Sequence, residues 1–205
     1  SVRVVVGEEL APAPVGRGPV TFTGDVATGD LNADGRADVV IGHGNRSETG
    51  NETGGVLVYY GQASGALRAQ PDLVINGQRD NDLFGANLLV TDVDGDRVDD
   101  LLVASPNQDL GRDGRGSVQV FLGARTGLAA TPERLLVGEA NGDSFGTSVV
   151  LEDLDGDGGR DLVVSAPNAS NPFNAACGRA GRVYVFRATP GLRGVFQLVP
   201  VQVIE

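Results

Sequence analysis

Three short acidic segments carry oxygen-bearing side chains at the same spacing. We name them loop 1 (30–38), loop 2 (92–100) and loop 3 (153–161), and we number each from its first aspartate. The oxygen-bearing side chains stand at positions 1, 3, 5 and 9, and they are Asp30, Asn32, Asp34 and Asp38; Asp92, Asp94, Asp96 and Asp100; and Asp153, Asp155, Asp157 and Asp161. Glycines at position 4 or 6 allow the chain to wrap tightly, so that alternate side chains converge on one point. The carbonyl oxygen at position 7 can join them, and it belongs to Arg36, Val98 or Gly159.

This set of donors is typical of a calcium site. Ca²⁺ binds many oxygen ligands, whereas Mg²⁺ prefers to keep its waters and transition metals favour nitrogen or sulfur. An EF-hand loop would need a glutamate at position 12, but Ile41, Val103 and Val164 stand there, each inside an apolar run. We therefore expect three bound Ca²⁺ ions outside the EF-hand class. The alternative is three acidic turns that bind no metal.

The charge balance favours the metal and indicates its role. The ligand carboxylates, three in loop 1 and four in each other loop, equal the net charge of −11 in size. A divalent cation would offset their mutual repulsion and fix the turn, so we expect a structural ion. The acidic balance also argues against nucleic acid and anionic membrane surfaces as partners.

No other feature indicates catalysis or membrane insertion. His43 is the only histidine and has no visible catalytic companion, and the sequence contains no nucleophile elbow, zinc motif or phosphate loop. We therefore expect no enzymatic activity. No apolar run is long enough to cross a membrane. The single cysteine, Cys177, allows no intrachain disulfide, which is ordinary for an exported bacterial protein.

The elements that position the loops repeat with them. The first aspartates are 62 and 61 residues apart, and a phenylalanine stands eight residues before each, at Phe22, Phe84 and Phe145. A nearly unbroken apolar run follows each loop, an alternating run begins at Gly54, Gly116 and Gly181, and a looser apolar run closes the unit. The pattern predicts four short antiparallel strands in each unit, the second of them buried on both faces. This is an all-β fold built from β-propeller blades; the alternative is a β-sandwich made of the same strands.

These residues resemble the FG-GAP repeat, the blade unit of integrin α-subunit heads and of many bacterial surface proteins. The matching marks are Phe84-Gly85, Phe145-Gly146, the three acidic loops, and "ASP" and "SAP" after the second strand. The resemblance covers nearly the whole chain. It implies a propeller with calcium in the loops between the first and second strands and with ligand contacts on the opposite face.

The unit boundaries follow from the repeat. We expect one propeller region over 1–205, made of a leading strand and loop (1–19), blade 1 (20–80), blade 2 (81–141) and blade 3 (142–205). Family propellers usually have seven blades, and exposed sheet edges would be sticky. We therefore expect either a fragment of a longer propeller or a protein partner that completes it.

The loops between the second and third strands are the candidate ligand surface, because they are polar and longer than a tight hairpin needs. The residues that we select there are Arg112, Arg115, Asn171 and Phe173. The favoured function is a non-enzymatic, calcium-stabilised propeller for adhesion, ligand binding or assembly, outside the cell, at a cell surface or in a bacterial outer envelope. Two alternatives stay open: a carbohydrate-binding propeller, which would need aromatic platforms, and the propeller portion of a larger secreted hydrolase or lyase.

Overall fold

The computed structural model describes residues 24–43, 53–78, 82–107, 114–170, 180–188, 200 and 202–204. Within this part of the chain every regular element is a strand, and the strands form three four-stranded antiparallel sheets. No helix in the described residues is long and apolar enough to cross a membrane. The predicted leading segment (1–19) and Phe22 lie outside the described residues.

Each sheet contains the four strands of one repeat in chain order. The first consists of β1 (Val26–Gly29), β2 (Asp38–His43), β3 (Gly55–Tyr59) and β4 (Leu73–Asn76). The second consists of β5 (Asn87–Thr91), β6 (Asp100–Ser105), β7 (Ser117–Phe121) and β8 (Arg134–Val137). The third consists of β9 (Ser148–Glu152), β10 (Asp161–Ala166), β11 (Arg182–Phe186) and β12 (Gln202–Ile204). Four antiparallel strands in sequential order form a propeller blade, and the all-β prediction is confirmed.

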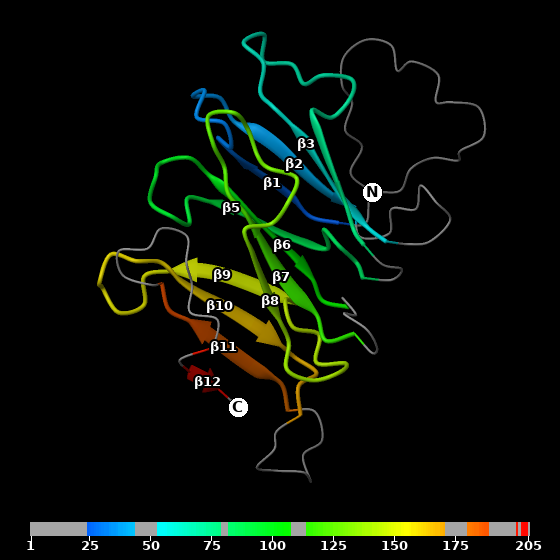
Figure 1. Cartoon of the computed structure of the whole chain (residues 1–205), viewed down its shortest axis with the longest axis vertical. Coiled ribbons are helices and arrows are strands. Elements are labelled where there is room, and N and C mark those ends of the chain that lie inside the picture. Colours follow the sequence, from blue (N-terminus) through cyan, green and yellow to red (C-terminus); the bar gives the residue numbers. More distant parts are fainter. Residues whose placement is uncertain are drawn as a thin grey trace, which may run out of the picture.

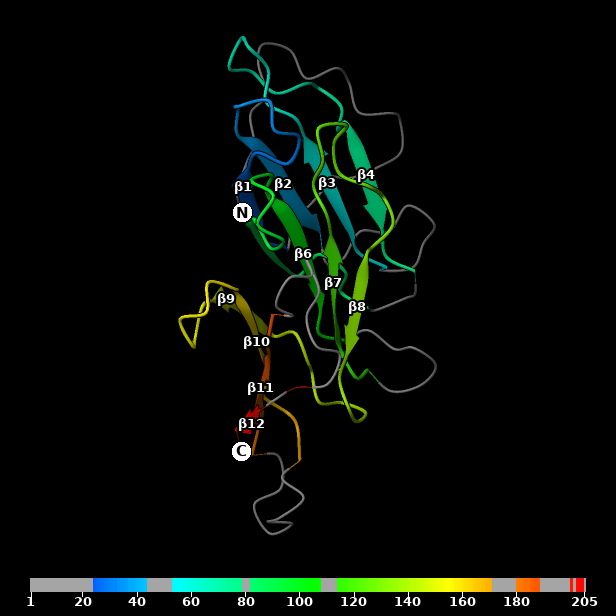
Figure 2. The ribbon, with the colours of Figure 1, turned by 60° about the vertical axis from the view of Figure 1, so that its left-hand side comes forward.

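The sheets follow one another along the long axis of the molecule and do not close into a ring (Figures 1 and 2). Their first strands lie at the shared inner side, where β1 contacts β5 and β5 contacts β9. In a two-layer sandwich each sheet would cover the other on one face. Here the middle sheet packs against a neighbour on both faces, which is the arrangement of consecutive blades.

Strand β6 shows how the sequence achieves this packing. All six of its residues are buried. Because side chains alternate across a strand, Leu101 and Val103 join the apolar cluster shared with the first sheet, while Leu102 and Ala104 join the cluster shared with the third. The unbroken apolar run therefore serves two interfaces at once, as predicted for a strand buried on both faces.

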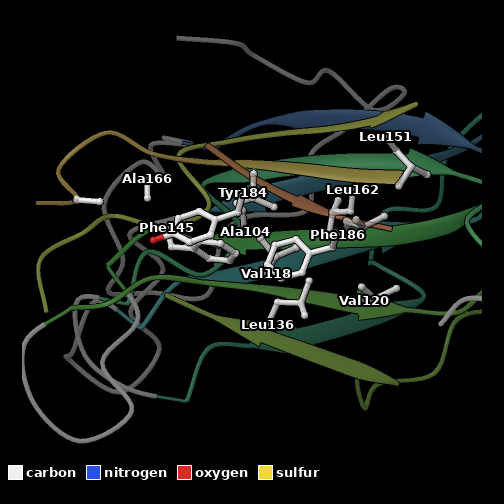
Figure 3. Close-up of a cluster of buried hydrophobic side chains, with 13 residues drawn as sticks. Ala104, Val118, Val120, Leu136, Phe145, Leu151, Leu162, Ala166, Tyr184 and Phe186 are labelled. Atoms are coloured by element: carbon white, nitrogen blue, oxygen red, sulfur yellow. The ribbon is translucent and has the colours of Figure 1, made fainter. Parts of the chain in front are cut away.

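Aromatic side chains concentrate in these two clusters. Phe145 lies edge-to-face with Tyr184 and with Phe186, at ring-centroid distances of 5.4 and 6.0 Å, between the second and third sheets (Figure 3). Phe84 makes the corresponding contact with Phe121 at 6.4 Å between the first and second sheets. Each such pair contributes about 0.5–1.5 kcal/mol beyond the burial of its area.

The Phe-Gly pairs join each sheet to the preceding one. The prediction started each first strand at its phenylalanine, but β5 and β9 begin three residues later. The phenylalanines instead form parallel bridges to the preceding sheet, Phe84 with Gly54 and Phe145 with Gly116. The backbones meet so closely that a Cβ on Gly116, where φ is +83°, would lie 2.1 Å from the Phe145 carbonyl oxygen. This glycine is therefore part of the interface between two blades.

We expect Gly116→Ala to reduce the free energy of unfolding by about 3 kcal/mol or more, because it adds a backbone clash to left-handed strain. The matched control is Gly65→Ala, since Gly65 has φ +75° but no atom within 4 Å of the added Cβ. The control should lose only about 1–2 kcal/mol, the conformational cost alone. Urea unfolding of both variants measures the difference. Equal losses would show that the close approach of Phe145 to Gly116 carries no energetic weight.

Candidate metal-binding loops

The three acidic loops join the first and second strands of their sheets and lie on the same side of the molecule. In Figure 1 they are the blue, green and yellow turns next to β1–β2, β5–β6 and β9–β10. Their backbones share one shape, because positions 4 and 6 have positive φ in every loop. These residues are Ala33 (54°) and Gly35 (79°), Gly95 (78°) and Arg97 (71°), and Gly156 (77°) and Gly158 (87°). Sequence reasoning asked for a glycine at only one of the two positions, but the fold requires a left-handed residue at both.

Side-chain oxygens stabilise this shape from within. The first aspartate of loop 2, Asp92, accepts hydrogen bonds from the N–H groups of Gly95 (2.7 Å) and Arg97 (2.9 Å). Asp153 is placed identically in loop 3, with Gly156 at 2.7 Å and Gly158 at 3.0 Å. In loop 1, Asp30 accepts from Asp34 at 3.0 Å and from Gly35 at 2.9 Å.

The side chains at positions 3 and 5 each accept the N–H group two residues later. In loop 2 these bonds run from Asp96 to Asp94 (2.9 Å) and from Val98 to Asp96 (2.8 Å). Such Asx turns aim successive carboxylates toward the middle of the loop. Backbone N–H groups of the loop thus hold these side-chain oxygens in the positions from which they would bind a cation.

The aspartate at position 9 anchors each loop to its sheet. Asp38, Asp100 and Asp161 have relative exposures of 0%, 1% and 1%. One oxygen of each accepts the N–H group of position 2, at 2.9, 2.7 and 3.2 Å in the three loops. The other accepts an N–H group at the end of the third strand, and the donors are Gly61 (2.9 Å), Gly123 (2.8 Å) and Ala188 (3.1 Å). One carboxylate therefore ties the loop to a strand 23 to 27 residues away.

Burial disfavours the ionised form of two of these carboxylates. Burial raises the pKa of Asp100 to about 7, and the charges of Asp94 and Asp92 add to the increase, although hydrogen bonds from Gly123 and Val93 oppose it. Burial likewise raises the pKa of Asp38. A cation in the loop would reverse this balance, because it favours the ionised carboxylate.

Two loops bring acidic ligand atoms into one small volume. Single ligand atoms of Asp92, Asp94 and Asp100 lie within 4.8 Å of one another, as do those of Asp153, Asp155 and Asp157. Loop 1 has Asn32 at position 3, so an amide oxygen replaces one carboxylate there. All these donors are hard oxygens, and the chemistry of the set fits Ca²⁺. The carbonyl oxygens of Arg36, Val98 and Gly159 stay a prediction from the sequence.

Of the four residues selected for the ligand surface, one lies in the described part of the chain. Arg115 precedes β7 at the end of the sheet opposite the acidic loops, is exposed, and donates from Nε to the Asn141 side-chain oxygen at 3.2 Å. Arg112, Asn171 and Phe173 lie outside the described residues.

Sequence reasoning missed the contacts between neighbouring loops. The residue at position 8 reaches back to the preceding sheet. Asp99 of loop 2 accepts the Asp30 N–H group at its carboxylate (2.8 Å) and donates its own N–H group to the Asp30 carbonyl (3.0 Å). Arg160 of loop 3 donates to the Thr91 hydroxyl at 2.6 Å. Asp99 was visible as an extra acid beside Asp100, but only the packing of two sheets reveals its partner.

We expect positions 3 and 9 to respond differently to loss of charge. Asp94→Asn keeps the acceptor oxygen for Asp96, so it should preserve this turn and reduce the stabilisation by Ca²⁺. In Asp100→Asn the amide NH₂ group would face one of the two backbone N–H donors, so a hydrogen bond is lost. The free energy of unfolding should fall by about 1–3 kcal/mol even without metal. Chemical unfolding in metal-free and calcium buffers measures both. Equal metal-free losses would contradict the anchoring role of Asp100.

The raised pKa of Asp100 predicts a pH dependence in metal-free protein. The folded chain holds this proton up to about pH 7, while the unfolded chain releases it near the ordinary value of 3.8. The contribution of Asp100 to stability is therefore complete at low pH and is lost as the pH rises through about 7. Melting temperatures from pH 5 to 8, in buffer passed over a chelating resin, should fall more steeply in the parent than in Asp100→Asn. Parallel slopes would contradict the shift.

Comparison with known proteins agrees with the repeat. A family model described as the FG-GAP repeat matches residues 22–59, 84–121 and 145–186. Integrin alpha-IIb of Homo sapiens is 31% identical over 186 residues, which cover 87% of this chain and 17% of that protein. Integrin alpha-7 of Homo sapiens is 34% identical over 148 residues, or 71% of this chain and 12% of that protein.

One similar protein belongs to another class. Phosphatidylinositol-glycan-specific phospholipase D of Bos taurus is 35% identical over 121 residues, covering 58% of this chain and 14% of that protein. The chain thus spans less than a fifth of the length of these relatives. Each matched segment covers the first three strands of one sheet and contains its acidic loop. The chain belongs to the FG-GAP repeat family and is similar to integrin alpha subunits.

Proposed function

We propose that the chain is a non-enzymatic, calcium-stabilised β-propeller segment that binds or assembles with a protein partner. Its place would be outside the cell, at a cell surface or in a bacterial outer envelope. The observation that carries the proposal is the preorganised loop: in each repeat, oxygen donors are held inward by the loop backbone and anchored to the sheet through a buried aspartate.

Calcium bound in these loops would act structurally. The ligands proposed are the side chains at positions 1, 3, 5 and 9 with the carbonyl of position 7. The ion supplies positive charge beside carboxylates that burial otherwise destabilises. Because the anchor of position 9 joins the loop to the third strand, holding the loop also holds the blade. All the acidic side chains of this set would bind the ion, so none would remain for catalysis at the metal.

The need for a partner or further blades rests on the open ends of the stack. On the inner strands, Val26 of β1 and Val150 of β9 are 47% and 49% exposed. Gly181 precedes β11 with φ +79°, the conformation of Gly54 and Gly116, which pair with the phenylalanine of the next sheet. A further Phe-Gly segment would find the same pairing site there. We therefore propose blades over 20–80, 81–141 and 142–205, with a leading strand and loop over 1–19, within one propeller region.

The binding surface proposed is the end of the sheets opposite the acidic loops. Arg115 lies there, and Arg112, Asn171 and Phe173 belong to the same loops in the sequence. Loops on a rigid sheet can vary without cost to the core, which is why binding sites commonly occur on them. The metal and the partner would then occupy opposite ends of each blade.

A second candidate is a propeller that supports an enzyme. The similarity to phosphatidylinositol-glycan-specific phospholipase D favours it. Its catalytic groups would lie outside the three repeats. Assay for hydrolysis of this chain, and of any longer protein that contains it, separates the two candidates.

We expect Ca²⁺ to raise the melting temperature of metal-free protein. A ligand at a hundredfold excess over its Kd contributes about 2.7 kcal/mol per site, which corresponds to about 5–10 °C for a chain of this size. Differential scanning calorimetry with Ca²⁺, with Mg²⁺ and with chelator measures the shift. Mg²⁺ at equal concentration should give a clearly smaller one, because it resists losing its waters.

Unchanged melting in Ca²⁺ and chelator would overturn the structural role of the ion. Solution mass, measured by sedimentation in both buffers, tests the partner. A stable, soluble monomer in calcium buffer would contradict the need for a partner or for further blades.

A further inference from the structure

A cationic side chain from outside the third loop contacts two of the aspartates in that loop. Arg187 directly follows β11, where the first and second repeats have Tyr60 and Leu122. One terminal nitrogen of its guanidinium lies 3.1 Å from a carboxylate oxygen of Asp155 and also forms an ion pair with Asp161. These aspartates occupy positions 3 and 9, so the guanidinium spans two of the four predicted metal ligands of loop 3.

In loop 2 the position-9 aspartate has the same backbone contacts without an ion pair to any described residue. Both Asp100 oxygens accept backbone N–H groups, from Val93 and Gly123, and among the described residues no arginine contacts this carboxylate. Its ligand atom lies within 4.8 Å of those of Asp92 and Asp94, whereas the group formed in loop 3 consists of Asp153, Asp155 and Asp157. The position-9 aspartate is therefore gathered with the other acids in loop 2 and paired with arginine in loop 3.

The arginine of loop 1 contacts a different position of its loop. Arg36 pairs with Asp34 at position 5, while its Nε donates to the Gly61 carbonyl at 2.9 Å. Asp38, the buried ligand of that loop, is held by the N–H groups of Leu31 and Gly61. Among the described residues, Arg187 is the only arginine whose side chain contacts a position-9 aspartate.

We infer that Arg187 competes with the metal ion for loop 3, so that Ca²⁺ fills loop 2 before loop 3. The inference rests on the proposed calcium function. A divalent ion at positions 1, 3, 5 and 9 would lie where the guanidinium now contacts Asp155 and Asp161, and two cations cannot share those oxygens. Arg187 has a side-chain exposure of 29%, so it has a route to solvent, while Asp161, at 2%, stays in place.

This arrangement gives blade 3 a distinct dependence on calcium. Without metal, Arg187 offsets the buried charge of Asp161, and loop 3 stays folded. With metal, the ion must break that pair, which lowers the apparent affinity. The third sheet then tolerates calcium concentrations at which loop 2 is filled and loop 3 is not.

The test is a Ca²⁺ titration followed by amide NMR, because each loop has its own glycine reporters: Gly35 in loop 1, Gly95 in loop 2 and Gly158 in loop 3. In the parent protein, the Gly95 amide should reach its calcium-bound position at a lower concentration than the Gly158 amide, by about tenfold or more. Arg187→Leu places the residue of blade 2 in blade 3. It should increase the affinity reported by Gly158 about tenfold and leave that reported by Gly95 unchanged.

Arg160→Leu is the matched control, because it removes the same charge from loop 3 but its guanidinium contacts Thr91. The affinity reported by Gly158 should change little in this variant. A second readout covers a variant that folds poorly: Arg187→Leu should melt below the parent in chelator, where Asp161 loses its partner, and should recover most of the difference in saturating Ca²⁺.

The outcomes separate the two proposals. Equal affinities at Gly95 and Gly158 in the parent, unchanged by Arg187→Leu, would overturn the competition by Arg187 and leave the calcium function intact. An equal gain in Arg160→Leu would also overturn it, since charge alone would then explain the effect. No calcium-dependent shift at any of the three glycines, in parent or variant, would overturn the calcium function itself.

Discussion

The buried aspartate at position 9 is the constraint on which the rest of the structure depends. Among the described residues, it is the one charged side chain in each repeat that is almost fully removed from solvent and also contacts both the loop and the third strand. A desolvated carboxylate is tolerated only where hydrogen bonds and positive charge offset its cost. Two backbone N–H groups supply the hydrogen bonds in all three repeats. The repeats differ in positive charge, because Asp161 pairs with Arg187 while no arginine of the described chain contacts Asp38 or Asp100.

The three repeats therefore solve one electrostatic problem in more than one way. In the part of the chain that the structure describes, Asp100 contacts only backbone donors, and its pKa is raised to about 7. Asp161 forms an ion pair with Arg187, which replaces an apolar or aromatic residue of the other repeats. Strong similarity of sequence in the loops thus conceals a difference that arises from a residue 26 positions further along the chain.

Local spacing predicted much of this molecule, because the features concerned are local. The nearly unbroken apolar run of β6 predicted its two buried faces. The contacts that escaped prediction join residues far apart in the sequence. Asp99 meets Asp30 across 69 residues, and Phe145 meets Gly116 through a bridge between two sheets. Such pairs depend on how one blade lies on the next, which the pattern within a single repeat does not contain.

The same contacts extend the effect of a cation beyond its own loop. Asp100 would hold the ion, and its neighbour Asp99 holds the first residue of loop 1 by two hydrogen bonds. Loop 3 is joined to the end of β5 through Arg160 and Thr91. An ion that fixes one loop therefore also fixes its position-8 residue, which forms hydrogen bonds to the preceding sheet. Because the apolar clusters lie between sheets, metal binding would stabilise the stack of blades more than any single blade, and the loss of one ion would weaken the interface before the sheet.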